Sequence, residues 1–221
     1  MLRLLLLYRE APMKKAAVGF RVHSGWSVAV AVCLERGAPV VLHRERPHLV
    51  EEFTFRFRQP YHTAESMPLA EARKFVSKAQ ETARELGHRA ICKLQAKSED
   101  RGYKLCAGAV LLASGKPLPE FERILASHAM IHTADGELFR EALTRACIRC
   151  GLQVVSLKER ELVREAADSF RLTEASVLKQ VTDLGKPLGA PWSQDEKYAA
   201  LAAWLVLANK DGCRSRKTRL A

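Results

Sequence analysis

The sequence lacks a hydrophobic run long enough to cross a membrane. Residues 4–7 are apolar, but Arg9 and Glu10 end that run. A membrane span needs roughly 20 apolar residues, and the core of a secretory signal needs roughly 7–15. We therefore expect a cytoplasmic protein that has no membrane partner. Because Met13 stands directly before a basic pair and a strand-like run, we interpret residues 1–12 as an N-terminal extension.

Acidic residues are scarce relative to basic ones. The 221 residues include 36 Lys and Arg but only 25 Asp and Glu, which gives a formal net charge of +11. A strongly positive field favours polyanionic partners, of which nucleic acid is the commonest. DNA or RNA binding through a basic surface is therefore one expectation, and a solvated basic surface without a particular partner is the alternative. Net charge indicates association and not chemistry.

The sequence also lacks internal repeats and a zinc-finger pattern. Cys147 and Cys150 have the CxxC spacing of a metal or redox pair, but no second pair follows at zinc-finger distance. The two residues lie within a helical pattern, so buried thiols are the commoner explanation. The apolar content of 48% and the charged content of 28% are ordinary for a soluble globular protein.

Hydrophobic periodicity predicts an alternation of strands and helices. Apolar runs bounded by turn residues predict strands over 16–22, 27–34, 40–43, 90–94, 105–112 and 152–157. The alternation of Phe53, Phe55 and Phe57 with polar residues predicts a further, half-buried strand. Helical spacing predicts helices over 67–86, 118–150, 158–167, 173–183 and 194–208. We expect the second of these helices to bend near Gly136, and the whole order favours one mixed sheet with helices on its faces.

Histidine is rare, yet two of the seven histidines stand one helical turn apart. His128, His132 and Asp135 occupy positions i, i+4 and i+7 of a predicted helix, so they project from the same side. Imidazoles at this spacing can hold one metal ion, and the carboxylate can ligate it or orient an imidazole. The stripe indicates a site for Zn²⁺ or Mn²⁺, or for metal-free acid–base chemistry. His62 and Glu65 add an imidazole and a carboxylate in a predicted loop.

Three segments share a pattern with one known family. They are AAVGF at 16–20 with WSVAV at 26–30, GELFREAL at 136–143 with CGLQV at 150–154, and DEKYAALAA at 195–203. They resemble the opening hairpin, the central helix and fifth strand, and the Asp-bearing last helix of the ribonuclease H-like superfamily, nearest to its Holliday-junction resolvase branch. The resemblance implies an α/β fold whose mixed sheet has three antiparallel strands, then parallel strands, and is flanked by helices. We expect a single such domain over 13–209 and a basic tail over 210–221.

The resemblance also implies a two-metal nuclease centre, but most of its carboxylates are absent here. Family nucleases use carboxylates to hold paired divalent cations, which stabilise the attacking and leaving oxygens. Arg21 and His23 stand near the place of the first-strand carboxylate, and no carboxylate ends the segment 105–114. Asp195 matches one family aspartate, but Tyr198 stands where its partner is expected. The centre is therefore either degenerate or rebuilt from histidines.

A rebuilt centre needs histidines from separate parts of the chain. In a ribonuclease H-like sheet the turn after the first strand faces the helix that follows the fourth strand, so we expect His23 to approach His128. The candidate catalytic residues are His23, His128, His132 and Asp135, and the candidate metal ligands are His128, His132, Asp135 and Asp195. The competing interpretation is that the histidines are ordinary turn and helix residues, and that Asp195 only stabilises the start of its helix.

Candidate nucleic-acid contacts fall in three places. Arg56 and Arg58 alternate with aromatic side chains, a composition typical of surfaces that stack single-stranded bases. Arg140 and Lys197 lie in the central and last helices, where they would hold a phosphate. The remaining candidates lie in the basic tail and are Arg214, Arg216 and Lys217. The alternatives are ion-paired helix faces and a core role for the phenylalanines.

Three functions are consistent with these features. The first is a ribonuclease H-like protein that binds nucleic acid, with a degenerate or histidine-based centre in place of the two-metal site. The alternative is a metal-dependent hydrolase of a non-nucleic-acid substrate that uses the stripe of His128, His132 and Asp135. The third is a non-enzymatic assembly module. Salt-sensitive DNA or RNA affinity would favour the first, and a metal content that depends on the two histidines would favour the second.

Overall fold

A five-stranded mixed sheet forms the centre of the computed structural model, which describes residues 13–113 and 117–209. The strands are β1 (Lys14–His23), β2 (Trp26–Glu35), β3 (Ala38–Glu45), β4 (Tyr103–Leu112) and β5 (Gln153–Lys158). Their order in the sheet is β3-β2-β1-β4-β5; β1, β2 and β3 are antiparallel neighbours, whereas β4 and β5 run parallel to β1. The predicted ribonuclease H-like sheet is confirmed. The expected extension at 1–12 and the basic tail at 210–221 lie outside the described residues.

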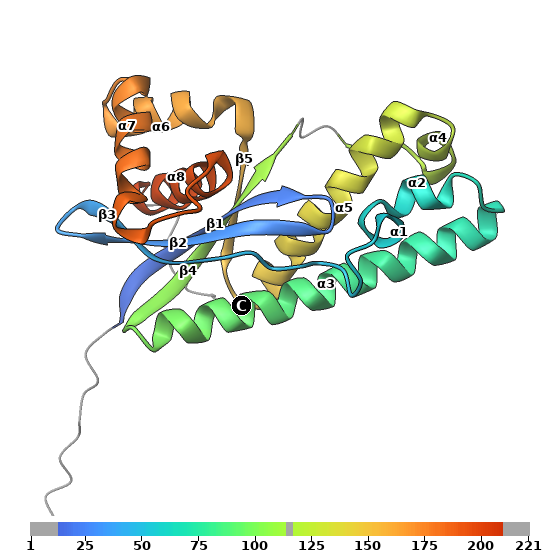
Figure 1. Cartoon of the computed structure of the whole chain (residues 1–221), viewed down its shortest axis with the longest axis horizontal. Helices are drawn as coiled ribbons and strands as arrows, with labels where there is room; N and C mark the ends of the chain where they lie inside the picture. The colour runs from blue at the N-terminus through green and yellow to red at the C-terminus, as the bar shows by residue number, and fades with distance from the viewer. Residues whose placement is uncertain (1–12, 114–116, 210–221) are drawn as a thin grey trace, which may run out of the picture.

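Helices cover both faces of this sheet (Figure 1). They are α1 (Phe55–Arg58), α2 (Pro60–Ala64), α3 (Leu69–Glu99), α4 (Phe121–Leu125), α5 (His128–Arg149), α6 (Leu162–Phe170), α7 (Glu174–Leu184) and α8 (Gln194–Ala208), with short 3₁₀ turns η1 (Glu159–Glu161) and η2 (Lys186–Leu188). Helix α8 packs on one face against β1, β2 and β4, and α3 and α5 pack together on the other. Among the described residues, no helix combines the length and apolar character that a membrane span requires.

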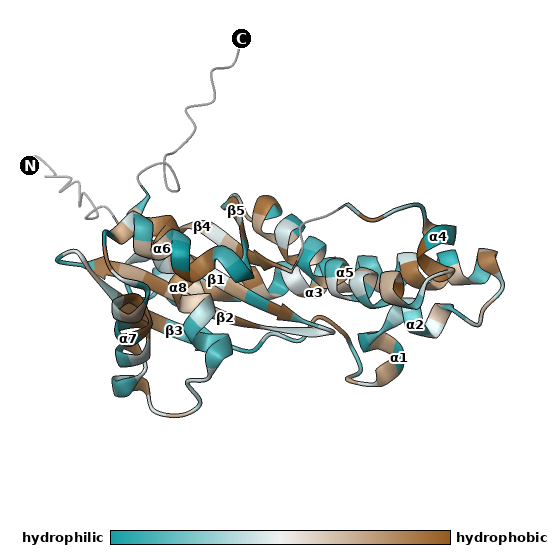
Figure 2. Ribbon diagram, turned by 90° about the horizontal axis from the view of Figure 1, so that it is seen from above, coloured by the Kyte–Doolittle hydropathy of each residue, from teal (hydrophilic) through white to brown (hydrophobic). Residues whose placement is uncertain are grey.

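The long helices α3 and α5 extend beyond the sheet and form an arm. Figures 1 and 2 both show α1, α2 and α4 gathered at the far end of these helices, away from the strands. We call α1, α2, α4 and the N-terminal halves of α3 and α5 the helical arm. Contacts of α2 and α4 with α5, and of α2 with α3, hold these short helices in place. The arm is the part of the molecule that the sheet does not support.

Two apolar layers explain why the sheet lies between helices. Alternate residues of β1 point to opposite faces, so Phe20 packs with the side of α3 and α5, while Ala17 packs with α8. Residues 199–206 of α8 are all buried, as expected for a helix that is apolar on most of its sides. Gly19 permits the close approach of α8 to β1, because a Cβ atom there would lie 1.9 Å from the carbonyl oxygen of Ala199.

The strand predicted across Phe53, Phe55 and Phe57 is wrong. Residues 55–58 form the helical turn α1, and Pro60 then opens α2 at its first position. The side chains of Phe53 and Phe55 are 48% and 62% exposed, so a core role for them is also wrong. The period of two was too short, at five residues, to distinguish a strand from an irregular segment.

The strand predicted over 90–94 is also wrong, because α3 continues without a break to Glu99. Gly87 does not end the helix predicted over 67–86. It is buried against α5, and a Cβ atom at Gly87 would lie 3.4 Å from the Cβ of Ala146. Ile91 and Leu94 therefore enter the core from a helix.

The helix predicted over 118–150 is divided, but the division does not fall at Gly136. It falls between α4 and α5 at Ala126 and Ser127, and Gly136 lies within the regular part of α5. The last helix has the bounds predicted for it, 194–208, and begins with a capping box: Ser193 Oγ accepts from the Asp195 backbone N–H, and the Glu196 carboxylate accepts from the Ser193 N–H.

Candidate functional site

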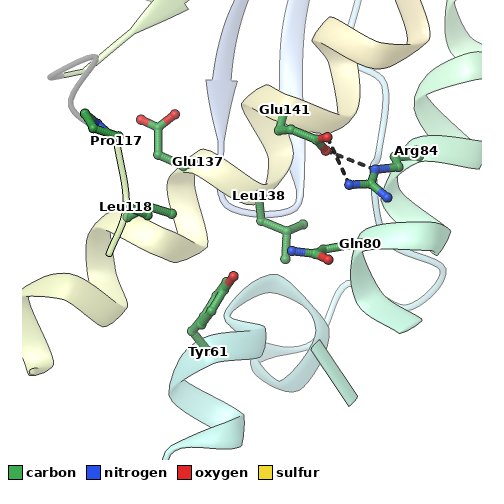
Figure 3. A pocket seen from close by; sticks show the side chains of 8 residues that line it. All are labelled: Tyr61, Gln80, Arg84, Pro117, Leu118, Glu137, Leu138 and Glu141. Carbon is green, nitrogen blue, oxygen red and sulfur yellow. Dashed lines mark hydrogen bonds and ion pairs between the residues drawn. The ribbon is translucent and has the colours of Figure 1, made fainter. Parts of the chain in front are cut away.

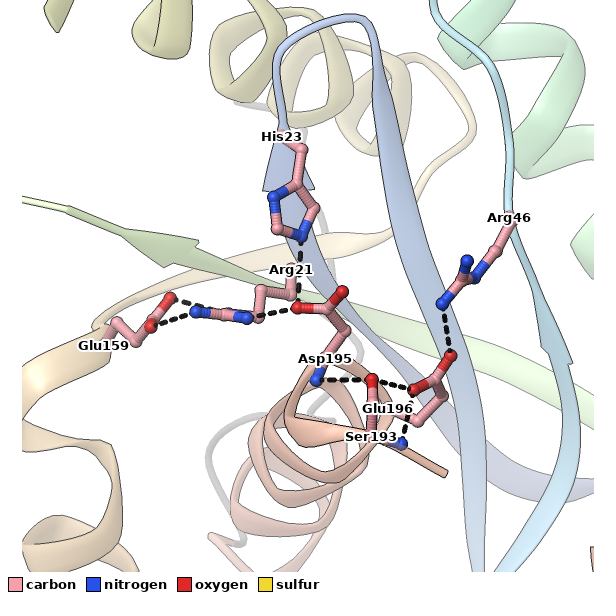
Figure 4. A network of polar contacts seen from close by, with 7 residues as sticks. All are labelled: Arg21, His23, Arg46, Glu159, Ser193, Asp195 and Glu196. Atoms are coloured by element: carbon pink, nitrogen blue, oxygen red, sulfur yellow. Dashed lines mark hydrogen bonds and ion pairs between the residues drawn. The ribbon is translucent and has the colours of Figure 1, made fainter. Parts of the chain in front are cut away.

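Arg21 lies at the centre of an ion-pair network at the carboxyl end of β1 (Figure 4). Its guanidinium donates to both carboxylate oxygens of Glu159, at 2.7 and 3.0 Å, and also to Asp195 Oδ1. Glu159 comes from η1 and Asp195 from the first turn of α8. The hydrogen bonds from Arg21, chiefly to Glu159, raise the pKa of its side chain above the ordinary arginine value. A permanent cation therefore sits between two carboxylates at this edge of the sheet.

His23 belongs to the same network and does not join the other candidate histidines. Its Nε2 atom lies 3.1 Å from Asp195 Oδ1, and its ring stacks on Trp26 with the ring centroids 4.3 Å apart. In the described part of the chain, His23 is not among the histidines that lie within metal-ligand distance of His128. Asp195 is likewise separate from the other candidate metal ligands, since it is engaged by Arg21 and His23.

Glu159 also belongs to this network, although the sequence pattern did not predict it as a site residue. A usable signal existed, because β5 runs parallel to β4 and β4 runs parallel to β1. Residues that directly follow parallel strands share one edge of the sheet, which is the edge where side chains commonly form sites in α/β folds. Glu159 follows β5 and Arg21 is near the end of β1, so the topology brings them together.

A second site lies on the helical arm and consists of three imidazoles. His62 projects from α2, and His128 and His132 lie in the first turns of α5. Their candidate ligand atoms all lie within 4.8 Å of one another, and the Nε2 atoms of His128 and His132 are 3.1 Å apart. The ring of His62 has its centroid 4.3 Å from that of His132 and 5.3 Å from that of His128. We call these three residues the histidine group.

Asp135 stands behind this group and not beside its exposed members. One of its oxygens accepts the backbone N–H of Tyr61 at 2.8 Å, and the other lies 2.5 Å from His62 Nδ1. Asp135 is only 2% exposed. Burial raises the pKa of Asp135, while the hydrogen bonds from His62 and Tyr61 oppose that rise. Because Asp135 engages Nδ1 of His62, Nε2 is the ring nitrogen left to face a ligand.

Cys92 and Cys150, with His88, form another group that could hold a metal, near the opposite end of α5. The Sγ atoms of Cys92 and Cys150 are 3.8 Å apart, and His88 Nε2 is 3.6 Å from Cys92 Sγ. Cys147 does not take part, since it is buried against Gly108, and burial raises the pKa of its thiol to about 12. The CxxC residues therefore face different surroundings.

A pocket of about 390 Å³ opens between α2, α3 and α5 (Figure 3). Its lining residues are Tyr61, Gln80, Arg84, Pro117, Leu118, Glu137, Leu138 and Glu141. The Arg84 guanidinium pairs with Glu141 at 2.9 and 3.0 Å, and Arg140 pairs with Glu137 at 3.0 Å. The charged groups at the pocket are thus already paired, and none of the three imidazoles lines it.

The candidate nucleic-acid contacts are only partly gathered. The Arg58 guanidinium lies 4.4 Å from the centroid of the Phe53 ring, and the Arg56 guanidinium lies 5.1 Å from that of Phe75. The Phe55 ring is 6.2 Å from the ring of His62, which places this aromatic segment beside the histidine group. Two further candidates lie elsewhere, Arg140 in α5 and Lys197 in α8, and Arg214, Arg216 and Lys217 lie outside the described residues.

Comparison with known proteins supports the architecture. No protein-family model and no curated protein matches the chain. The structure is similar to RuvC of T. thermophilus in complex with a Holliday junction substrate, with a TM-score of 0.51 and 11% sequence identity over 88% of this chain and 93% of that one. A second Thermus thermophilus RuvC structure has a TM-score of 0.50 and 13% identity over 87% and 93%. This likeness confirms the predicted resolvase-type ribonuclease H-like fold.

Proposed function

We propose that this ribonuclease H-like protein binds nucleic acid through its helical arm. The observation that carries the proposal is the exposure of Phe53 and Phe55 next to Arg56 and Arg58, which we call the aromatic–basic surface. Exposed aromatic rings stack on nucleotide bases, and guanidinium groups bind phosphates and stack on the same rings. The net charge of +11 supplies the long-range attraction.

The scaffold supports a DNA ligand in particular. The RuvC structure to which this fold is similar is a complex with a Holliday junction substrate. A four-way DNA junction is therefore the first ligand to test, with duplex and single-stranded DNA of equal length beside it. Since stacking on aromatic rings needs unstacked bases, we expect this surface to favour single-stranded DNA or the open centre of a junction over plain duplex.

We further propose that the edge of the sheet does not cut DNA by the two-metal route. Two divalent cations need several carboxylates and no competing charge. Here the Arg21 guanidinium is already paired with Asp195 and Glu159, at the place where the resemblance implies a carboxylate. A second positive ion at this position would meet the charge of Arg21. The centre is therefore a degenerate one, held together by an internal cation.

A binding titration at several salt concentrations tests the nucleic-acid proposal. We expect the affinity for labelled junction and single-stranded DNA to fall as salt rises. The double substitution Phe55→Ala with Arg56→Ala is expected to weaken binding by about tenfold or more, because stacking of a base on an aromatic ring contributes about 1–3 kcal/mol.

The far end of α5 offers a matched control. Ile148 is 60% exposed and is followed by Arg149, so the double substitution Ile148→Ala with Arg149→Ala removes a large apolar side chain, which cannot stack on a base, and an arginine from another surface. This control is expected to bind within about twofold of the unsubstituted protein. Absence of salt-dependent binding, or equal losses in both double variants, would overturn the proposal.

A metal-dependent hydrolase of another substrate is the second candidate function. The three imidazoles on the arm favour it, because they could hold a metal whose bound water attacks an ester. Hydrolysis of chromogenic phosphate and carboxylate esters, with and without added Zn²⁺, tests it. Turnover that requires Zn²⁺ and disappears in His132→Ala would support this candidate, and absence of turnover with Zn²⁺ bound would exclude these ester classes.

A further inference from the structure

We infer that His62, His128 and His132 form a binding site for one Zn²⁺ ion on the helical arm. This ligand set differs from the one predicted from the sequence and the family resemblance, since His62 from α2 is added and Asp135 and Asp195 are not ligands. The inference does not rest on nucleic-acid binding, because it concerns the metal and the three imidazoles alone.

The distances in the group are close to those that zinc requires. Zinc binds imidazole nitrogen at about 2.0–2.1 Å, so two nitrogens of a tetrahedral site lie roughly 3.3 Å apart. The Nε2 atoms of His128 and His132 are 3.1 Å apart, and all candidate ligand atoms lie within 4.8 Å. Because α2 and α5 are already in contact, we expect rotation of the exposed imidazoles about their side-chain bonds to close the remaining gap.

A cation would also resolve a conflict between the rings. Each neutral imidazole has one N–H donor and one lone pair, and protonated imidazoles repel one another. Three rings with centroids 4.3–5.3 Å apart therefore compete for a limited number of hydrogen bonds. A Zn²⁺ ion accepts one lone pair from each ring and removes this competition.

The buried carboxylate of Asp135 is the independent feature that distinguishes this group from a chance cluster. A metal-binding histidine commonly donates its other ring N–H to a carboxylate, which fixes the tautomer and strengthens the ligand. Asp135 provides this contact to His62 at 2.5 Å and is itself fixed by the Tyr61 N–H. A carboxylate that is 2% exposed and hydrogen-bonded to an imidazole that faces two others is the arrangement of a preorganised metal site.

The site would keep one coordination position open. His128 and His132 are exposed, and the described residues contribute no further Cys, Asp or Glu atom to this group. Three protein ligands and one open position are typical of catalytic zinc sites, in which water occupies the fourth position. The Phe55 ring lies near the site, with its centroid 6.2 Å from that of the His62 ring. An anionic oxygen, such as that of a phosphate, is the chemical class that would replace the water.

Zinc could also bind the second group of candidate ligands, which consists of His88, Cys92 and Cys150. Spectroscopy can distinguish metal bound by this group from metal bound by the histidine group. Cobalt bound by thiolate sulfur shows an intense near-ultraviolet charge-transfer band that cobalt bound by imidazole lacks. We expect Co²⁺ added to the metal-free protein under reducing conditions to give tetrahedral visible bands without a sulfur band at the first equivalent.

Zinc titration against a chromogenic chelator then assigns the residues. His132→Ala, which removes an exposed side chain, is expected to lower the affinity of the first Zn²⁺ at least about 100-fold. The matched control is His48→Ala, because His48 is exposed and stacks on Phe53 outside the group. His48→Ala and Cys92→Ser are both expected to remain within about twofold of the unsubstituted protein.

Each outcome of this titration decides the inference. Failure of the metal-free protein to bind Zn²⁺, unchanged affinity in His132→Ala, or loss of the first site in Cys92→Ser would overturn it. Circular dichroism of each variant identifies a loss caused by unfolding, and the cobalt spectrum of the unsubstituted protein then decides alone. Because no nucleic acid is present, loss of DNA binding in the arm variants and loss of zinc in His132→Ala are separate results.

Discussion

The network around Arg21 and the histidine group differ in whether the chain itself supplies a cation to the clustered polar side chains. At the edge of the sheet, two carboxylates share a cation that belongs to the chain, the guanidinium of Arg21. On the arm, three imidazoles are gathered with one carboxylate behind them and no built-in cation among them. The carboxylates of the first cluster are already ion-paired without a ligand, whereas the second cluster contains no cation that would organise it. Ligand binding is therefore to be sought on the arm.

The two regions also depend on different parts of the fold. The Arg21 network joins β1, η1 and α8 across the sheet, so it requires α8 to stay close to β1. The histidine group requires only that α2 stay against α5, beyond the edge of the sheet (Figure 1). Substitutions that move α8 should disturb the first region and leave the second intact.

Gly19→Ala is expected to have the largest effect on this comparison. The added Cβ would lie 1.9 Å from the Ala199 carbonyl oxygen, so α8 must move away from β1. We expect the free energy of unfolding to fall by about 3 kcal/mol, measured by urea titration. Zinc affinity should not change, since the added Cβ points toward α8, on the face of the sheet opposite α3 and α5.

The control for this substitution is Gly87→Ala, on the α3–α5 side. Its Cβ would lie 3.4 Å from the Ala146 Cβ, and Ala favours a helix interior over Gly by about 1 kcal/mol. We expect little loss or a small gain of stability. An equal loss of stability in Gly19→Ala and Gly87→Ala would show that the close approach of α8 to β1 does not make Gly19 more sensitive to substitution than Gly87.

Asp135→Ala is expected to have the next largest effect, because it removes the carboxylate behind the histidine group. The buried N–H of Tyr61 and His62 Nδ1 would lose their partner. Hydrogen bonds to a charged group contribute about 1.5–3 kcal/mol, so we expect the free energy of unfolding to fall by about 2–3 kcal/mol. Zinc affinity should fall about 10–100-fold.

Asp135→Asn separates these two losses. Its amide oxygen can still accept from the Tyr61 N–H, so most of the stability should remain. Its NH₂ group would donate to His62 Nδ1, which moves the ring proton to Nε2 and blocks that nitrogen as a ligand. We expect near-normal urea unfolding with weakened zinc binding. Normal zinc affinity in Asp135→Asn would contradict the role assigned to Asp135.

Much of the sheet could be predicted from the sequence, because its strands are bounded by turn residues and have clear periodicity. The antiparallel hairpin and the last helix follow from local pattern, and the capping box at Ser193 marks the start of that helix. The length of α3 could not be predicted in the same way. Glycine commonly ends helices, and only the contact of Gly87 with α5 shows that this glycine instead permits close helix packing.

The candidate site was predictable only where it depends on spacing within one helix. The spacing of His128 and His132 in α5 placed them together, and their rings do lie side by side. The addition of His62 depends on how α2 packs against α5, which no local pattern encodes. The position of Asp135, one turn further along the helix, predicted a metal ligand. In the structure its carboxylate is instead buried and contacts Nδ1 of His62.

Substitution of Arg21 tests whether the edge network depends on its internal cation. Arg21→Ala leaves Asp195 and Glu159 without their shared partner, and we expect a loss of about 1–2 kcal/mol because the groups are partly exposed to solvent. Arg84→Ala removes half of a more exposed pair, with Glu141, and should lose less than about 1 kcal/mol. Urea unfolding of both variants gives the comparison.

Arg21→Asp sharpens the same test by adding a third carboxylate. Carboxylates that face one another repel, and Mg²⁺ or Mn²⁺ would relieve the repulsion. In metal-free protein we expect the variant to have a lowered melting temperature that Mg²⁺ restores, whereas Mg²⁺ should not change the melting temperature of the unsubstituted protein. A response of the unsubstituted protein to Mg²⁺ would show that Arg21 does not exclude the ion.

His43 provides the smallest expected effect and a contrast with the histidine group, because it is an imidazole that is partly buried against α3. Its Nε2 lies 2.9 Å from Ser98 Oγ, and its Nδ1 is buried. Burial, with Lys97 and Arg101, lowers its pKa, while Glu45 opposes that shift. A lowered folded-state pKa means that stability is present at neutral pH and falls as pH drops below the ordinary histidine value of 6.5.

His43→Gln removes the titrating ring but keeps an amide near Ser98. Urea unfolding between neutral and mildly acidic pH should therefore give a shallower loss of stability in the variant than in the unsubstituted protein. All other side chains are identical in the two proteins, so the difference between the two slopes belongs to His43. Parallel slopes would show that partial burial against α3 does not keep this ring neutral. The contrast between a partly buried imidazole and the exposed imidazoles of the arm would then not account for the placement of the proposed metal site.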